Sequence, residues 1–293
     1  MKVGKLFYLT RPLALLAFVL PLIAQAESVR VVASDLLSPY LEAPLKAFDA
    51  MDGLDLKVEG MGSIPALDQI RDGDADLAII AIPGDDAMPA GELKLYPFAF
   101  DASILAVSAM NPLNEISVEF LGGIFGSEEK NNFGRWGELG IPGWGNRNIK
   151  PVVATADESI AFELFKFHSI ESGALRSSVA FVSEDEVEEM ILSDAATICV
   201  LSRVPNSAGV KLLMVADSEG GPAYAPTEDN IYYGDYPIRL PFYIAFEPAK
   251  EELVRPLVRA LLSQDVSDAL KQAELFPLPD SIRENLLVDL DLE

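Results

Sequence analysis

The stretch NIYYGDYPIRLPFYIAF, Asn230 to Phe246, places turn-forming residues directly before an apolar run. Tyr236-Pro237 and Leu240-Pro241 hold the chain extended, because the residue before a proline is pushed out of the helical region. The run that follows, Phe242 to Phe246, has the apolar and aromatic composition of a strand. We therefore expect an extended segment that leads into a strand, rather than an active-site loop.

Strand and helix patterns alternate on both sides of this stretch. Apolar runs predict strands, and apolar residues at helical spacing predict helices. The expected strands include Val29–Ala33, Asp76–Ile82 and Asp101–Met110, and the expected helices include Val118–Phe125, Lys250–Leu262 and Val266–Ala273. Such alternation is typical of an α/β fold with a mostly parallel sheet, which binds ligands at the carboxyl ends of its strands.

Residues 1–26 have the composition of a cleavable signal peptide. Lys2, Lys5 and Arg11 form a positive region, an apolar run follows, and Ala24-Gln25-Ala26 offers a cleavage site. The alternative is an uncleaved membrane anchor, but the apolar run is shorter than the roughly 20 residues that a span requires. We expect export, most simply to the periplasm.

The chain is strongly acidic. Its 293 residues include 46 acidic and 22 basic side chains, and its formal net charge is −24. Nucleic acids and anionic membranes bind through basic patches, so this charge disfavours both as partners. We expect a soluble monomer, and the length suggests two lobes rather than one small core.

Catalytic and metal-binding signatures are weak. His168 is the only histidine and Cys199 the only cysteine, so they cannot form a transition-metal cluster. His168 is expected to pack on a helix, and Cys199 to be a buried thiol in the apolar run ATICVL. The chain lacks a Gly-x-Ser-x-Gly elbow, and Asp72, Asp74 and Asp76 lack the glycine and glutamate of a calcium loop. We expect neither an enzyme nor a bound metal or cofactor.

Three turns that open helices carry serines, at Ser34, Ser63 and Ser159. Backbone N–H groups and hydroxyls at helix N-termini can hold an oxyanion without a formal positive charge. The alternative is that each serine only caps its helix. Three such turns in one chain favour a binding site for a small ligand.

Five segments share the order and spacing of a known family. They are ASDLLSP, GMGSIPALDQIRDGDADLAI, FLGGIFGSEEKNNFGRWGELG, APTEDNIYYGDYPIRLPFYIAF and LLSQDVSDALKQAELFPLP. Together they resemble the periplasmic phosphate-binding proteins, the PstS-type solute-binding proteins of ABC importers. The resemblance covers nearly the whole chain after the signal peptide, and it is strongest in the third and fourth segments.

This resemblance implies a two-lobed α/β periplasmic-binding-protein fold of type II. One lobe would comprise residues 27–105 and 240–293, and the other residues 106–239. Two crossovers, near Ala106 and Arg239, would join the lobes, and hinge motion would close them on a ligand. The implied partners are a small-molecule or oxyanion ligand, phosphate by resemblance, and the permease of an ABC transporter.

The implied ligand residues are Ser34, Asp35, Leu36, Ser63, Thr155 and Ser159. Ser63 and Ser159 match the family pattern, but Asp35 stands where the family has a hydroxyl, and its carboxylate would repel an anion. Ala81 replaces the family's aspartate, and Thr155 replaces an arginine that would give the strongest phosphate contact.

The set of implied ligand residues suits a neutral or cationic solute better than phosphate, although Arg147 or Arg203 could supply a charge. A cleft that has lost its ligand and a protein that acts through a protein partner remain the alternatives.

Overall fold

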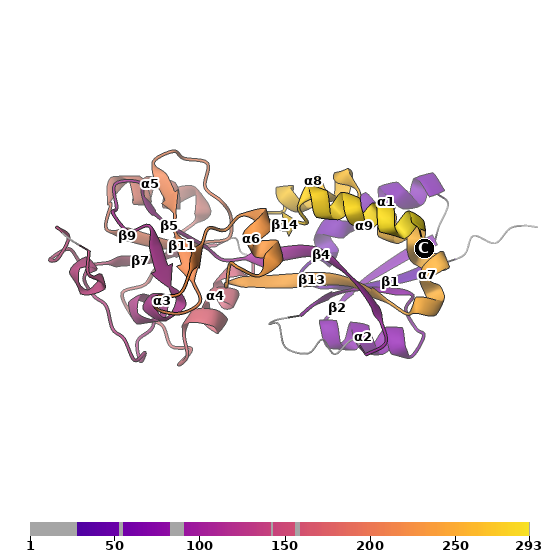
Figure 1. Cartoon of the computed structure of the whole chain (residues 1–293), viewed down its shortest axis with the longest axis horizontal. Helices are drawn as coiled ribbons and strands as arrows, with labels where there is room; N and C mark the ends of the chain where they lie inside the picture. The colour runs from indigo at the N-terminus through magenta and orange to yellow at the C-terminus, as the bar shows by residue number, and fades with distance from the viewer. Residues whose placement is uncertain (1–27, 53–54, 83–90, 142, 156–158, 293) are drawn as a thin grey trace, which may run out of the picture.

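The computed structural model describes residues 28–52, 55–82, 91–141, 143–155 and 159–292. The predicted signal peptide lies outside the described residues. Figure 1 shows an elongated molecule in which two α/β bodies lie side by side and long strands connect them. Within the described ranges, the helices are too short or too polar to cross a membrane.

The first body is built on a six-stranded sheet with the strand order β14-β4-β13-β3-β1-β2. β1 pairs in parallel with β2 and β3, while β13 runs antiparallel between β3 and β4. The strands are β1 (Ser28–Ser34), β2 (Asp55–Met61), β3 (Leu77–Ala81), β4 (Lys94–Ala102), β13 (Arg239–Phe246) and β14 (Phe276–Pro277).

Helices cover both faces of this sheet. The helices are α1 (Ser38–Asp52), α2 (Ser63–Arg71), α7 (Glu251–Leu261), α8 (Gln264–Gln272) and α9 (Asp280–Leu292). Figure 1 shows α2 on one face and α1, α8 and α9 on the other. Alternate strand residues supply the two cores: Val31 packs with Leu41 of α1, and Val32 packs with Leu67 of α2.

The second body holds a five-stranded sheet with the order β10-β5-β9-β7-β8 and a three-stranded sheet with the order β12-β11-β6. The strands are β5 (Ile104–Ser108), β6 (Glu115–Ser117), β7 (Lys150–Ala154), β8 (Ala180–Phe181), β9 (Thr197–Leu201), β10 (Val210–Leu212), β11 (Met214–Ala216) and β12 (Ala223–Tyr224). The helices are α3 (Val118–Phe125), α4 (Ala161–Ser169), α5 (Glu184–Ser193) and α6 (Glu228–Tyr233). Cys199 is fully buried in β9, and burial raises the pKa of its thiol.

The chain first passes between the two bodies at Ser103. β4 ends at Ala102 in one sheet and β5 begins at Ile104 in the other, so the prediction of a single strand from Asp101 to Met110 was wrong. The apolar run is continuous because both strands are buried, and the run alone does not show where the chain changes sheets. Ser103 fixes the crossing: its N–H donates to the Ile238 carbonyl at 3.1 Å, and its carbonyl accepts from the Tyr236 hydroxyl at 2.6 Å.

The chain returns through the stretch from Asn230 to Phe246. Its start is helical: α6 ends at Tyr233, and Gly234 takes a left-handed conformation with φ of 83°. Tyr236, Pro237 and Ile238 form bends instead of the expected extended chain, and β13 begins at Arg239, earlier than expected. Pro241 lies inside β13, and the pairing with β4 shifts register just after it, between Phe242 and Tyr243. β4 and β13 thus form a paired connection between the two bodies.

Candidate ligand-binding site

Two adjoining cavities lie between the two bodies, and Leu36 and Ile160 line both. The larger has a volume of about 1040 Å³ and lies between the turn before α1, the first turn of α2, and α4. We call it the apolar chamber, after Leu36, Ile64, Ala81, Ile160, Leu164 and Phe167. The smaller has a volume of about 400 Å³. We call it the acidic chamber, defined by Tyr40, Asp101, Ser159, Ser202 and Glu274.

Ser34, Asp35, Leu36 and Ser63 lie together at the wall of the apolar chamber that the first sheet forms. Ser34 is buried, and its Oγ accepts from the Leu36 N–H at 3.4 Å. Ser63 does not cap α2, since Gly62 is the N-cap residue and gives no side-chain bond. Instead the Ser63 Oγ accepts from the Ala81 N–H at 2.8 Å, so it ties the start of α2 to the end of β3.

The opposite wall of the apolar chamber is α4. Lys166 and Glu163 both line the chamber, and the Lys166 Nζ donates to the two Glu163 oxygens at 2.8 and 3.0 Å. This ion pair neutralises the one lysine that faces the chamber among the described residues. Asp35 and Glu171 also line it, so its charged groups are mainly acidic.

Two of the predicted residues lie elsewhere. Ser159 lines the acidic chamber, and its Oγ accepts from the Ala161 N–H at 3.1 Å at the start of α4. Thr155 follows β7 and lines neither chamber. Arg147 stacks its guanidinium over the Trp144 ring, 4.5 Å from the centroid, and also lines neither chamber.

Asp101 is the most deeply buried charged group of the acidic chamber, with 7% of its surface exposed. It lies near the end of β4, opposite Leu240 of β13. Its Oδ1 accepts from the Ala102 N–H at 2.7 Å. Burial, together with the nearby Glu274 carboxylate, raises the pKa of Asp101 to about 7.

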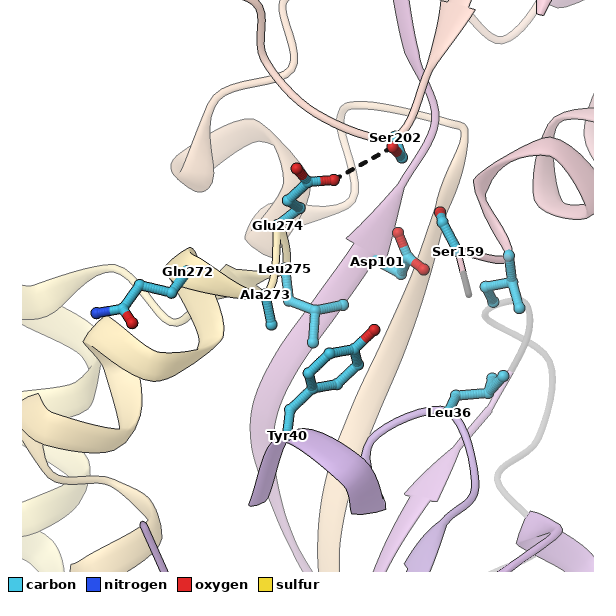
Figure 2. A pocket seen from close by; sticks show the side chains of 10 residues that line it. Leu36, Tyr40, Asp101, Ser159, Ser202, Gln272, Ala273, Glu274 and Leu275 are labelled. Atoms are coloured by element: carbon cyan, nitrogen blue, oxygen red, sulfur yellow. Dashed lines mark hydrogen bonds between the residues drawn. The ribbon is translucent and has the colours of Figure 1, made fainter. Parts of the chain in front are cut away.

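Glu274 enters the acidic chamber from the turn after α8. Figure 2 shows its carboxylate directed toward Ser202, whose hydroxyl lies 3.3 Å from Oε2. The same hydroxyl contacts Glu184. Arg203 lies 3.7 Å from Glu274 and 3.9 Å from Glu184. Burial and the Glu184 charge raise the pKa of Glu274, despite Arg203.

Sequence patterns did not point to Asp101, Ser202 or Glu274. The three residues come from β4, from the segment after β9 and from the turn after α8, so only the fold brings them together. The one local signal was a carboxylate in the otherwise apolar run FAFDASILAV around Asp101. A lone buried carboxylate in a strand is unusual and marks a candidate site.

The cleft formed by the two chambers favours hydrogen-bond donors and cations over anions. Carboxylates line both chambers, and Arg203, which follows Ser202 of the acidic chamber, already faces Glu184 and Glu274. Within the described residues, no group of three His, Cys, Asp or Glu side chains has an arrangement that could hold a metal ion.

Two α/β bodies, joined by paired strands and separated by a ligand-sized cleft, define the class of the two-lobed solute-binding proteins. In sequence, residues 23–268 match the PBP superfamily domain. The chain therefore belongs to this family, which is one of binding proteins and not of enzymes. The predicted two-lobed α/β fold is confirmed.

Solved structures agree with this fold. A possible phosphate binding protein from Planctomyces limnophilus is 18% identical, with a TM-score of 0.69, and the match covers 91% of this chain and 98% of that one. PstS from Borrelia burgdorferi is 16% identical, with a TM-score of 0.68 and coverage of 86% and 99%. An ABC-type phosphate transport receptor from Vibrio cholerae is 18% identical, with a TM-score of 0.58 and coverage of 86% and 100%. No curated protein matches the sequence.

Proposed function

We propose that this protein is an exported solute-binding protein that holds a small solute between its two lobes and delivers it to the permease of an ABC transporter. The observation that carries this proposal is the pair of adjoining chambers between the two bodies. Their walls come from loops and helix ends of both bodies, so closure of the bodies would enclose a ligand.

The lobes of this proposal are those expected from the sequence, residues 27–105 with 240–293 and residues 106–239, to within a few residues. The paired strands β4 and β13 and the segment held by Tyr236 and Ser103 would act as the hinge. Export to the periplasm rests on the composition of residues 1–26.

Phosphate is the solute named for two of the similar structures. The lining of this cleft does not favour it. Asp35, Asp101 and Glu274 would each face a bound anion, and Lys166 is already paired with Glu163. Carboxylates near a phosphate raise its energy unless cations offset them. A solute other than phosphate therefore fits the chambers better.

A thermal-shift screen tests the proposal. A ligand that binds only the folded protein raises the melting temperature by mass action. The screen includes phosphate, sulfate, amino acids, amines and small neutral solutes, each at millimolar concentration. At least one class of solute should raise the melting temperature reproducibly, whereas no rise with any class would overturn the proposal.

A protein partner is the second candidate, and one observation favours it. Ile64 and Phe167 are 71% and 72% exposed, and they lie on opposite walls of the apolar chamber. Exposed apolar groups of this size are common at protein contacts. If the screen finds no solute, capture of an envelope protein that Ile64→Ser and Phe167→Ser together abolish would support this alternative.

A further inference from the structure

Asp101 has the features of a ligand contact rather than of a structural carboxylate. It is 7% exposed and lines the acidic chamber, yet among the described residues its hydrogen-bond donor is the backbone N–H of its own neighbour, Ala102. Within the described residues, no basic side chain pairs with it. A buried carboxylate without a cation is costly, and natural proteins keep such groups mainly where they serve a function. Figure 2 shows Asp101 facing the same space as Ser159 and the Tyr40 hydroxyl.

Glu274 supplies a second carboxylate at a structural cost. Its φ is 64°, and among the described residues it is the one non-glycine residue with a positive φ. Glycine is the usual residue in this conformation after a helix, because other side chains are strained there. A glycine at this position would relieve the strain but remove the carboxylate from the chamber.

The apolar chamber adjoins these two carboxylates. Leu36 and Ile160 line both chambers, so a ligand of moderate length can extend from one chamber into the other. Ile64 of α2 and Phe167 of α4 are exposed at the walls of the apolar chamber. An apolar ligand body placed there would cover both side chains, and this burial would favour binding.

We infer that the cleft binds an amphipathic organic amine, with its ammonium group against Asp101 and Glu274 and its apolar body between α2 and α4. This inference rests on the proposed function, and it names the chemical class of the solute. A primary ammonium has three N–H donors. The Asp101 carboxylate can accept from it, and so can the Glu274 carboxylate, which also lies 3.7 Å from Arg203 and 3.3 Å from the Ser202 hydroxyl. Ser159 and Tyr40 line the same chamber. The Asp101 and Glu274 carboxylates would repel an anion of the same shape.

Calorimetric titration with three probes of one shape tests this inference. The probes are 2-phenylethylamine, which is cationic, 2-phenylethanol, which is neutral, and 3-phenylpropionate, which is anionic. At pH 8 the amine should bind at least about tenfold more tightly than the other two, because a hydrogen bond to a buried charged group contributes roughly this much. Equal or tighter binding of the alcohol or the carboxylate would overturn the inference and leave the proposed function standing.

Absence of binding by all three probes at millimolar concentration would also overturn the inference. The broad thermal-shift screen would then decide the proposed function separately.

Two variants and a matched control locate the ammonium. Asp101→Asn keeps the shape of the side chain and should weaken amine binding by about tenfold or more, while binding of 2-phenylethanol stays unchanged. Glu274→Gln should have a similar effect. Glu284→Gln removes a carboxylate from an exposed position on α9, outside both chambers, and should leave both affinities unchanged. Amine binding to Asp101→Asn that is as tight as to the unaltered protein would contradict the assignment.

Discussion

The two chambers of the cleft are neighbours, but they use their polar groups in opposite ways. In the apolar chamber, Ser34 and Ser63 bond to backbone N–H groups of the loops that shape the wall, and Lys166 is paired with Glu163. In the acidic chamber, Asp101 is buried with no cation paired to it in the described part of the chain, and Glu274 is held in a strained conformation. The polar groups named in the first chamber stabilise the fold, whereas Asp101 in the second is kept buried at a cost to stability.

The largest expected effect is on the pH dependence of stability. Burial raises the pKa of Asp101 from 3.8 to about 7, so between these values the folded protein binds a proton that the unfolded chain has lost. The free energy of unfolding therefore falls as the pH rises through this window. Asp101→Asn removes this contribution, so its stability relative to the unaltered protein should increase by about 3 kcal/mol between pH 5 and pH 8.

Urea unfolding of both proteins at the two pH values measures this difference. Glu274 is the charged group that faces Asp101, and Glu184 and Arg203 lie beyond it; all three are present in both proteins. A stability difference that does not change with pH would show that Asp101 is not buried as a carboxyl group.

Ser63→Ala should show that the Ser63 hydroxyl, at the wall of the apolar chamber, stabilises the fold. The variant leaves the Ala81 N–H without its acceptor, and a lost partner at a partly buried donor costs about 2 kcal/mol. Ser127→Ala is the control, since the Ser127 hydroxyl makes an exposed bond to the Ala174 carbonyl at 3.3 Å. Its expected cost is below about 0.5 kcal/mol. Equal stability of the two variants in denaturant unfolding would show that the Ser63 bond to Ala81 does not stabilise the fold.

Glu274→Gly should be more stable than Glu274→Gln, and both should weaken amine binding. A glycine relieves the positive φ, which is worth about 1 kcal/mol. Glu274→Gln keeps the strained backbone and loses only the charge, so it is the matched comparison. If the glycine variant is less stable than the glutamine variant, the positive φ at position 274 does not destabilise the folded protein.

The smallest expected effect on stability comes from Phe167→Ala. The side chain is 72% exposed, so its removal should change the free energy of unfolding by less than about 0.5 kcal/mol. Affinity for 2-phenylethylamine should nevertheless fall several-fold, because the phenyl ring of the ligand no longer buries apolar surface against the Phe167 side chain. Phe181→Ala, at a position that is also exposed but outside both chambers, should leave the affinity unchanged.

Much of the fold could be predicted from the sequence, because local patterns determine it. α3, for example, has the predicted limits Val118–Phe125. The break between β4 and β5 could not be predicted, since burial makes both strands apolar and the change of sheet depends on a distant contact, between Ser103 and Tyr236.

The candidate site was predictable only in part, because some of its residues are brought together by contacts between distant segments. Ser34, Asp35, Leu36 and Ser63 follow strand ends that are adjacent in the sheet, so short sequence motifs indicated a shared wall. Asp101, Ser202 and Glu274, in contrast, come from three separate segments of the chain. In the fold, helices α6 and α9 were not predicted. Residues that only the tertiary fold brings together have no characteristic spacing in the sequence, so no sequence motif identifies them.

A crystal structure of the protein grown with 2-phenylethylamine at pH 8 would compare the two chambers most directly. The expected result is the ammonium within hydrogen-bonding distance of the Asp101 and Glu274 carboxylates, with the phenyl ring between Ile64 and Phe167. The contradicting result is an amine bound elsewhere while an anion occupies the turns at Ser34 and Ser63.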